Sequence, residues 1–333
     1  MISQVQEKMP DAGRTAFPQS IIRLFAVVVI YKMPPSNSSS LQTLLTAART
    51  SANDLDLKIL VWDNTPGGQD PGKLPDKILY VSAPHNPGLA VAYNYVMNLA
   101  EVEGYEWMLT LDQDSILPAN FLVRIAEITS ELRPVKTVGA IVPQVIADGR
   151  IISPFQFLFG AWPHWFGRGY VGISRRAAYA ANSGSTLRIS ALREMGGYDP
   201  MFPLDLSDTN LFHRMHKSGN SVFIAGDLLL YHDFALLNKH ARMSIERYHA
   251  SLLDDCAFWD INMGTLARIE RILRFAARAY KESLRSEESS FRRRTLLEFK
   301  RRLLRSREQR IAEWREWATI RNSNSAQSPN QEV

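Results

Sequence analysis

The amino-acid sequence predicts an α/β protein built on a mostly parallel β-sheet, and three observations lead to this fold class. Residues 24–31 (LFAVVVIY) are apolar and rich in β-branched side chains, which is typical of a strand buried on both faces of a parallel sheet. Strand-like and helix-like segments then alternate as far as residue 142, a pattern that favours βαβ units with right-handed crossovers. Beyond residue 250 the pattern becomes helical, so helices are expected to extend this fold.

The expected elements follow one another in a regular order. Strands are predicted over 24–31, 57–62, 77–81, 105–111 and 137–142, and helices over 41–50, 88–100 and 120–132. The serines of MPPSNSSS can begin the first helix, because a serine hydroxyl accepts a hydrogen bond from an unpaired amide of the first turn. Gly196 and Gly197 predict a sharp turn, and Gly219 is expected to end a helix that runs to Lys217.

Four parts are expected along the chain. We interpret residues 1–20 as a flexible tail, 21–250 as the α/β domain, 251–322 as a basic amphipathic helical extension and 323–333 as a disordered tail. Within the domain, residues 155–170 contain seven aromatic side chains, three glycines and a proline. This segment is too irregular for a helix and too aromatic for an ordinary loop.

The charge of the chain is unevenly placed. The 39 Lys and Arg exceed the 34 Asp and Glu by five, whereas residues 268–321 alone hold 17 basic and 8 acidic residues. This local excess of +9 leaves the rest of the chain at −4. The basic character therefore belongs to the helical extension and not to the predicted α/β domain.

Composition excludes several classes of protein. With 45% hydrophobic and 22% charged residues, the chain is globular and not disordered throughout. A single cysteine, Cys256, excludes an internal disulfide and a Cys-based zinc site and favours a reducing, cytoplasmic setting. The apolar run 24–31 has eight residues, far fewer than the roughly 20 that span a bilayer, and no signal-peptide cleavage site precedes it.

Polar residues stand where the predicted strands end. Asp63 closes the second strand, Asn86 and Gly88 follow the third, and Asp112 and Asp114 close the fourth. In an open parallel sheet, ligands bind at the carboxyl ends of the strands. Two aspartates separated by one residue suit a hard divalent cation whose remaining ligands are phosphate oxygens. The structural alternative is that Asp112 caps the helix at 120 or lies in solvent.

The segment NPGLAVAYN, which begins at Asn86, opens a helix with small residues on one face. Such a helix start permits the close approach of a diphosphate, but tight packing against the sheet is an equally good interpretation. The chain has neither a G-x-G-x-x-G nor a G-x-x-x-x-G-K-[ST] motif. Dinucleotide-binding and P-loop sites therefore lack their main sequence support.

Two further positions carry candidate side chains. Asp205 and Asp208 lie near the start of the helix that runs to Lys217, where a carboxylate is either a helix cap or a general base. His232 follows the strand-like run LLLY, where it could bind a metal near Asp114 or be a structural histidine at a strand end.

Taken in chain order, these motifs resemble those of the family-2 glycosyltransferases of the GT-A fold. They are VVVIY, VWDN, NPGLAVAYN, LTLDQDS, ANSGSTLR, MGGYDPMFPLDLSDTNLFHRMHKSG and YHDF. Within that family the chain is most similar to bacterial rhamnosyltransferases, in which the LDQDS variant of the D-x-D motif is typical. The resemblance covers about residues 21–250 and implies a Rossmann-like, mostly parallel sheet with flanking helices.

The resemblance implies a role for each matched position on the donor side. Asp63 matches the acid that contacts the nucleotide base, and Asn86 and Gly88 match the loop and helix start beside the donor. Asp112 matches the acid near the ribose and the donor sugar. Asp114 matches the ligand of Mg²⁺ or Mn²⁺, with Asp112 beside it.

On the acceptor side, Asp208 matches the catalytic base and Asp205 a neighbouring acidic position. His232 matches a histidine that completes the metal shell in some members. Residues 182–185 match the acceptor-side turn. The chain departs from the family pattern at Lys32, where Asn is usual, at Ser207, where Glu often precedes the base, and at Asn210, where a further acid is common.

The expected activity is an inverting, single-displacement transfer of L-rhamnose from dTDP-L-rhamnose to a hydroxyl of a cell-surface or lipid-linked glycan. An alternative within the family is a UDP-hexose or UDP-galactofuranose donor. A non-enzymatic alternative is a basic protein that binds membranes or polyanions.

The basic extension has its own competing interpretations. Its arginines alternate with Glu and Leu at helical spacing and form no recognised nucleic-acid motif, so specific nucleic-acid binding is not expected. A basic helix with apolar side chains on its other face can lie on an anionic membrane, which would place the enzyme on the inner face of the cytoplasmic membrane. Packing against its own domain or against a partner subunit of a homo-oligomer is the alternative.

Overall fold

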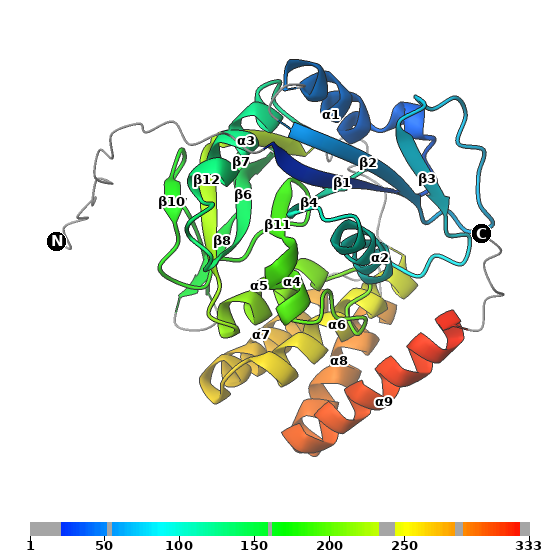
Figure 1. Cartoon of the computed structure of the whole chain (residues 1–333). Coiled ribbons are helices and arrows are strands. Elements are labelled where there is room, and N and C mark those ends of the chain that lie inside the picture. Colours follow the sequence, from blue (N-terminus) through cyan, green and yellow to red (C-terminus); the bar gives the residue numbers. More distant parts are fainter. Residues whose placement is uncertain (1–20, 52–54, 159–161, 233–243, 284–288, 327–333) are drawn as a thin grey trace.

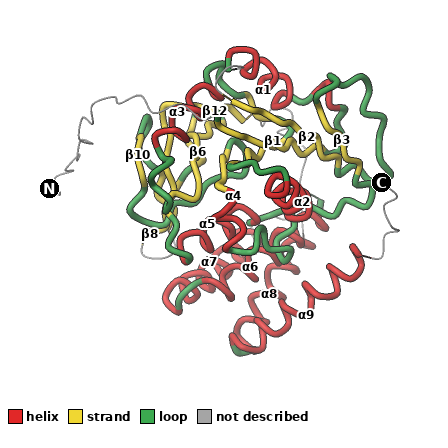
Figure 2. The backbone as a smooth tube through the Cα atoms, viewed as in Figure 1, coloured by secondary structure: helices red, strands yellow, loops and turns green. Residues whose placement is uncertain are grey.

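The computed structural model describes residues 21–51, 55–158, 162–232, 244–283 and 289–326. A central β-sheet lies between two helical layers, and a further group of helices packs beneath one of them (Figure 1). The backbone trace separates the sheet clearly from this helical base (Figure 2). The tail predicted over residues 1–20 lies outside the described residues.

The central sheet confirms the predicted fold class. Its strand order is β10-β12-β6-β11-β4-β1-β2-β3, with β5 beside β12 and β7 beside β6. The long strands are β1 (Ile22–Ile30), β2 (Leu55–Asp63), β3 (Ile78–Ser82), β4 (Trp107–Asp112), β6 (Val138–Ala147) and β12 (Ser221–His232). All six run in the same direction, because β4 and β6 are both antiparallel to the strand between them.

The remaining described strands are short and antiparallel to their neighbours. They are β5 (Ser115–Ile116), β7 (Arg150–Ser153), β10 (Val171–Ile173) and β11 (Ser185–Arg188) in the main sheet, and the separate pair β8 (Phe155–Leu158) and β9 (Trp162–Trp165). The aromatic segment 155–170 therefore contributes a small sheet of its own. The tip of that segment, residues 159–161, lies outside the described residues.

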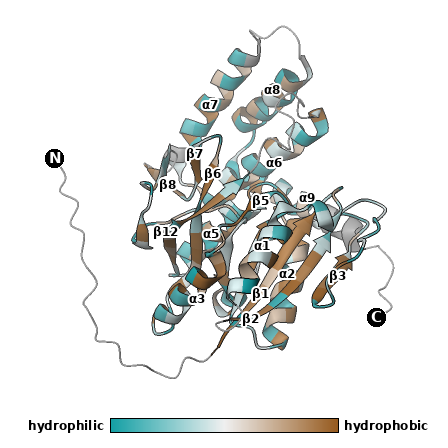
Figure 3. Ribbon diagram, turned by 90° about the horizontal axis from the view of Figure 1, so that it is seen from above, coloured by the Kyte–Doolittle hydropathy of each residue, from teal (hydrophilic) through white to brown (hydrophobic). Residues whose placement is uncertain are grey.

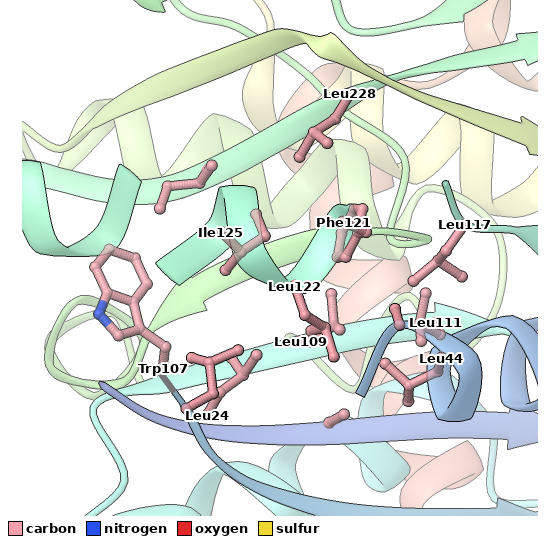
Figure 4. Close-up of a cluster of buried hydrophobic side chains, with 14 of the residues drawn as sticks. Leu24, Leu44, Trp107, Leu109, Leu111, Leu117, Phe121, Leu122, Ile125 and Leu228 are labelled. Carbon is pink, nitrogen blue, oxygen red and sulfur yellow. The ribbon is translucent and has the colours of Figure 1, made fainter. Parts of the chain in front are cut away.

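Helices cover both faces of the sheet. On one face lie α1 (Ser39–Thr50) and α3 (Phe121–Glu131), and on the other α2 (Leu89–Val102), α4 (Ile189–Glu194) and α5 (Ser207–Lys217) (Figure 1). Leu44, Phe121 and Ile125 pack against strand residues such as Leu109 (Figure 4). Strand β1 is buried almost throughout, which accounts for its uninterrupted apolar sequence.

The helical base consists of α6 (Ile245–Asn262), α7 (Thr265–Ser283), α8 (Ser289–Leu304) and α9 (Arg307–Ala326); a short 3-10 turn, η1 (Pro35–Asn37), lies elsewhere, directly before α1. Seen from above, α7 and α8 stand away from the mainly hydrophobic sheet (Figure 3). The predicted boundary at residue 250 falls inside α6. Helix α9 continues to Ala326, so residues 323–326 of the predicted disordered tail are helical, and residues 327–333 lie outside the described part.

The base has its own hydrophobic cluster, which includes Phe258, Phe275 and Trp314 and reaches Phe202 of the α/β domain. The rings of Phe202 and Phe258 meet edge to face, with centroids 6.3 Å apart. The extension is thus packed against its own domain. Within the described ranges, no helix is both long enough and apolar enough to cross a bilayer.

Candidate active site

The predicted site residues gather where the parallel strands end. In the sheet register, Asp63 at the end of β2 lies opposite Ile30 of β1, and Asp112 at the end of β4 lies opposite Val29. The two aspartates therefore flank the end of the same central strand. This is the edge of an open parallel sheet at which ligands bind.

Asp63 is fully buried. Its Oδ2 accepts a hydrogen bond from the hydroxyl of Tyr80 at 2.6 Å, and its Oδ1 accepts one from the backbone amide of Thr65 at 2.8 Å. Both carboxylate oxygens of Asp63 thus have hydrogen-bond partners within the protein. A ligand at this place would contact the residues that Asp63 holds in position, Thr65 and Tyr80.

The segment Asp112-Gln113-Asp114 alternates its side chains as the i, i+2 spacing predicts. The Gln113 side chain turns away and accepts a hydrogen bond from the Tyr31 amide at 2.8 Å, while its carbonyl accepts one from the Ser38 hydroxyl at 2.8 Å. Gln113 thereby fastens the loop to the end of β1 and the start of α1. The two flanking aspartates remain available to a common ligand.

Asp114 lies beside His232, with Oδ1 and Nε2 3.6 Å apart. The other ring nitrogen of His232 is 3.0 Å from the Ser115 hydroxyl, which in turn is 2.6 Å from the hydroxyl of Ser183. A hydrogen bond to one ring nitrogen orients the other toward a ligand, which is the arrangement of most metal-binding histidines.

The pair fits a divalent cation. Two ligand atoms on one Mg²⁺ ion, each about 2.1 Å from it, lie at most about 4.2 Å apart, so the 3.6 Å separation of Asp114 and His232 can be bridged by one ion. Among the described residues, no three His, Cys, Asp or Glu side chains form a metal-binding group. Asp112, Asp114 and His232 therefore do not form a complete cage, and oxygen atoms of a substrate would have to supply further ligands.

Asp208 lies in the first turn of α5. Its Oδ1 accepts hydrogen bonds from the amide of Thr209 at 2.5 Å and from the Thr209 hydroxyl at 3.2 Å. Burial raises the pKa of Asp208, and hydrogen bonds from Thr209 and from the Asn182 backbone oppose that shift. A base with a raised pKa binds a proton more readily than an ordinary aspartate does.

Electrostatics join the two ends of the site. Burial raises the pKa of Asp112 to about 7, and the charges of Asp114 and Asp208 add to this effect. Like charges disfavour one another only when they are near. The structure therefore brings together the strand-end acids and the acid of α5, which are 94 residues or more apart in the chain.

The turn that contains Asn182 connects these parts. The Asn182 carbonyl accepts a hydrogen bond from the Thr110 hydroxyl at 2.6 Å, and its side chain bonds to the hydroxyls of Tyr198 and Ser207 at 2.9 and 3.0 Å. The next residue, Ser183, accepts a bond from the Asp112 amide at 3.2 Å. Residues 182–185 thus connect the end of β4 to the start of α5.

Gly88 begins α2 at a close crossing of two loops. Its φ is +91°, and a Cβ at this position would lie 2.5 Å from the Pro203 carbonyl oxygen. That oxygen accepts a hydrogen bond from the Leu89 amide at 2.5 Å. The small residue at this helix start therefore admits the backbone of the loop that leads to Asp208. Asn86 also has a positive φ, of 48°, in the turn before the helix.

Asp205 is committed to a bidentate ion pair with Arg247 of α6, in which Oδ1 lies 2.6 Å from one guanidinium nitrogen. This pair connects the loop before α5 to the helical base. Leu206, which follows, has a left-handed conformation with φ of 56°. Asp208 lies three residues further along the chain, in the first turn of α5, and makes no ion pair among the described residues.

Several side chains of the site are not apparent from the sequence motifs. Ser115, Ser183 and Tyr198 lie within the quoted motifs but had no role assigned to their side chains, and Tyr80 lies outside the motifs; all four hydroxyls make hydrogen bonds in the site. The only sequence signal for Tyr80 is its place on the third predicted strand, next to the strand that ends in Asp63.

Comparisons with known proteins describe the fold only. No protein-family model matches the chain, and no curated protein matches it. Among solved structures, GalNAc-T7 crystallised with UDP, GalNAc and Mn²⁺ has a TM-score of 0.49 at 11% identity, covering 74% of this chain and 50% of its own. S. aureus TarS has a TM-score of 0.47 at 12% identity, covering 75% of this chain and 47% of its own.

A shorter structure of S. aureus TarS, residues 1–349, gives a TM-score of 0.45 at 12% identity over 76% of this chain and 79% of its own. The chain spans about half the length of the first two of these structures. At such identities and scores the likeness carries no information about donor, acceptor or mechanism. The α/β fold with a mostly parallel sheet and flanking helices stands on the strand order itself.

Proposed function

We propose that this protein is a metal-assisted, inverting glycosyltransferase that uses a nucleotide-sugar donor. The observation that carries the proposal is the meeting of Asp112, Asp114 and Asp208 at one edge of the sheet, where their charges influence one another. Such a cluster of uncompensated acids is costly to a protein on its own. A bound cation would compensate part of this negative charge, and a substrate hydroxyl could donate a hydrogen bond to one of the carboxylates.

The residues divide into two functional groups in this proposal. Asp114 and His232 would hold Mg²⁺ or Mn²⁺, which when bound neutralises the charge of a departing diphosphate. Asp63, together with its hydrogen-bond partners Thr65 and Tyr80, and Asp112 would position the nucleotide and the sugar. Asn86 and Gly88 would shape the loop beside them.

Asp208 would accept the proton of the acceptor hydroxyl as that oxygen attacks the sugar. Such general-base catalysis typically contributes 10²–10⁴-fold to the rate. Asp205 would serve as a positioning residue, because its ion pair with Arg247 fixes the loop before α5. The displacement needs no covalent intermediate with the protein.

For the donor we propose dTDP-L-rhamnose, on the basis of the LDQDS segment and its resemblance to rhamnosyltransferases. The acceptor would be a hydroxyl of a glycan or lipid-linked glycan. A UDP-hexose or UDP-galactofuranose donor is the alternative within the same chemistry.

A donor screen tests this proposal. Purified full-length protein with Mn²⁺ should bind dTDP-rhamnose more tightly than UDP- or GDP-sugars in isothermal titration, and EDTA should weaken that binding. Tighter binding of a UDP-sugar would replace the donor and keep the enzyme class. Binding of no nucleotide-sugar would contradict the proposed function.

We further propose that the enzyme works against an anionic membrane. The support is α7, where Ile269 and Leu273 are 52% and 65% exposed one turn apart, beside the arginines of the same helix. Apolar side chains within a basic surface are complementary to anionic headgroups over acyl chains. In liposome flotation, replacing both with Ser should reduce binding to anionic vesicles, whereas Val102→Ser, at an 84% exposed site elsewhere, should not.

The alternative that the protein binds polyanions through its helical base has less support. Arginines of α8 and α9 are used within the base: Arg302 and Arg310 pair with the buried Asp260, and Arg301 pairs with Glu313. Charges that are already paired inside a fold are not available to an extended nucleic-acid backbone.

A further inference from the structure

A cavity lies at the edge of the sheet opposite to the candidate active site. It has a volume of about 330 Å³ and is lined by residues at the start of β4, at the ends of α2 and α3, and at the junction of β11 with α4. Trp107, which begins β4, lines this cavity, whereas Asp112, which ends β4, belongs to the candidate active site. The two places are therefore separated by the length of that strand.

Arg188, at the end of β11, is the most informative side chain of this cavity. It is only 8% exposed, and its guanidinium lies 4.3 Å from the centre of the Trp107 ring. Its Nε donates to the Val138 carbonyl at 2.8 Å, and its Nη2 donates to the carbonyls of Leu132 and Val135, each at 3.3 Å. These contacts fix the plane of the guanidinium. The third nitrogen, Nη1, makes no hydrogen bond among the described residues.

The buried charge of Arg188 has no carboxylate as a direct partner. Within the described part of the chain it makes no ion pair, and burial lowers its pKa while the charge of Glu106 opposes that shift. A buried cation without a paired countercharge is costly to a folded protein. The neutral carbonyls occupy two of its three nitrogens, but they supply neither a countercharge nor a partner for the third.

The other charges around the cavity add to this positive excess. Three basic and two acidic residues line it, namely Arg133, Lys136, Arg188, Glu101 and Glu106. Glu101 pairs with Arg193 at 2.8 Å, so that three cations face the single charge of Glu106. Pockets that hold small molecules have volumes of about 300–1,000 Å³, and this cavity falls at the lower end of that range. Its size and charge together suit a small anion.

We propose that this cavity is a second ligand site, which binds a small phosphate ester. In this arrangement Nη1 of Arg188 donates to a phosphate oxygen, because a guanidinium held in a fixed plane matches the geometry of a phosphate. Arg133 and Lys136 contribute further positive charge. The site goes beyond the proposed function, since it lies away from the acids that the donor and the acceptor would contact.

Isothermal titration with glycerol phosphate, in EDTA and at constant ionic strength, tests this proposal. The wild type should bind one equivalent. Lys136→Gln should keep the melting temperature and bind about 10-fold more weakly, because it removes one charged contact with the anion, and Arg133→Gln should also weaken binding. Lys77→Gln is the matched control, because Lys77 is likewise exposed and directly precedes a parallel strand, β3, and it should bind as the wild type does.

Two competition experiments locate the ligand and identify its chemistry. Saturating nucleoside diphosphate with Mn²⁺ should not displace glycerol phosphate, and displacement would overturn the proposal by placing the ester at the acidic edge. Acetate should bind more weakly than glycerol phosphate, and equal or tighter binding of acetate would overturn the phosphate assignment. The proposal also fails if the wild type shows no saturable binding, or if Lys136→Gln and Arg133→Gln bind glycerol phosphate as tightly as the wild type does.

Discussion

Asp260 in the helical base and Asp208 at the edge of the sheet are aspartates in opposite surroundings. Asp260 is fully buried, and although burial opposes its ionisation, the charge of Arg302 and hydrogen bonds from Arg302, Trp314 and Arg310 lower its pKa. Burial raises the pKa of Asp208, and no ion pair among the described residues offsets it. The Asp260 carboxylate thus has its countercharges within the fold, whereas the Asp208 carboxylate has no countercharge among the described residues.

The same contrast extends to whole regions. In the base, several acidic side chains pair with arginines, as in the contacts of Arg271 with Asp255 and of Arg301 with Glu313. At the sheet edge, carboxylates outnumber their partners. Paired charges thus characterise the base, and acids without a countercharge characterise the sheet edge.

The largest effect on stability is expected from Asp260→Asn. It leaves Arg302 and Arg310 buried without a countercharge, which should lower the free energy of unfolding by about 3–5 kcal/mol. Chemical denaturation measures the change. The control is Asp227→Asn, which breaks the half-exposed pair with Arg124 and should cost about 1 kcal/mol or less. Equal losses for both variants would contradict the special role of Asp260.

Asp114→Asn tests the metal-binding half of the sheet edge. The variant should fold normally, lose about 100-fold in transfer rate and need a much higher Mn²⁺ concentration for half of its remaining activity. Asp76→Asn, which changes an exposed acid away from the edge, should leave both values unchanged. An unaltered Mn²⁺ requirement in Asp114→Asn would remove this residue from the metal site.

Gly88→Ala tests how the edge is assembled. The added Cβ would meet the Pro203 carbonyl at 2.5 Å, and the residue has a φ of +91°, so the variant should be destabilised by about 1–3 kcal/mol. Because Pro203 belongs to the loop before Asp208, the transfer rate should fall even at temperatures where the variant is fully folded. Gly149→Ala, at an open position with φ of +73°, separates backbone strain from the clash.

A smaller effect concerns His213, which lies where the two regions meet. Burial lowers its pKa to about 4, with further contributions from Lys217 and His216. Between pH 6.5 and 4 the unfolded chain therefore binds a proton at this position that the folded protein does not. The free energy of unfolding thus decreases as the pH falls through this window, and the His213 side chain has no such destabilising effect above it. His213→Gln should flatten the slope of melting temperature against pH, and His85→Gln, at an exposed site away from His213, should not.

Much of the fold could be predicted from the sequence, because the long parallel strands are buried on both faces and are therefore mostly apolar. Strand β1 is recognisable from its apolar run, whereas β11 (STLR) is polar in sequence although all four residues are buried. Its place between β4 and β6 depends on neighbours that are distant in sequence. Local patterns carry no information about such an insertion.

The candidate site divides in the same way. Strand ends predicted the positions of Asp63, Asp112 and Asp114, because the direction of parallel strands brings their carboxyl ends together. The bidentate partner of Asp205 and the hydrogen bonds that surround Asn182 could not be predicted from sequence. Each depends on packing between elements that are far apart in the chain.

Asp208→Asn gives the most direct test of the account, through transfer rate and melting temperature measured on the same preparation. Because the folded-state pKa of Asp208 is raised, its charged form costs stability at neutral pH, so the variant should melt at the same temperature as the wild type or higher. The rate of sugar transfer from the donor identified in the screen should fall by about 10²–10⁴-fold. A variant that keeps near-normal transfer, or that loses activity only by unfolding, would contradict the assignment of the sheet edge as the catalytic site.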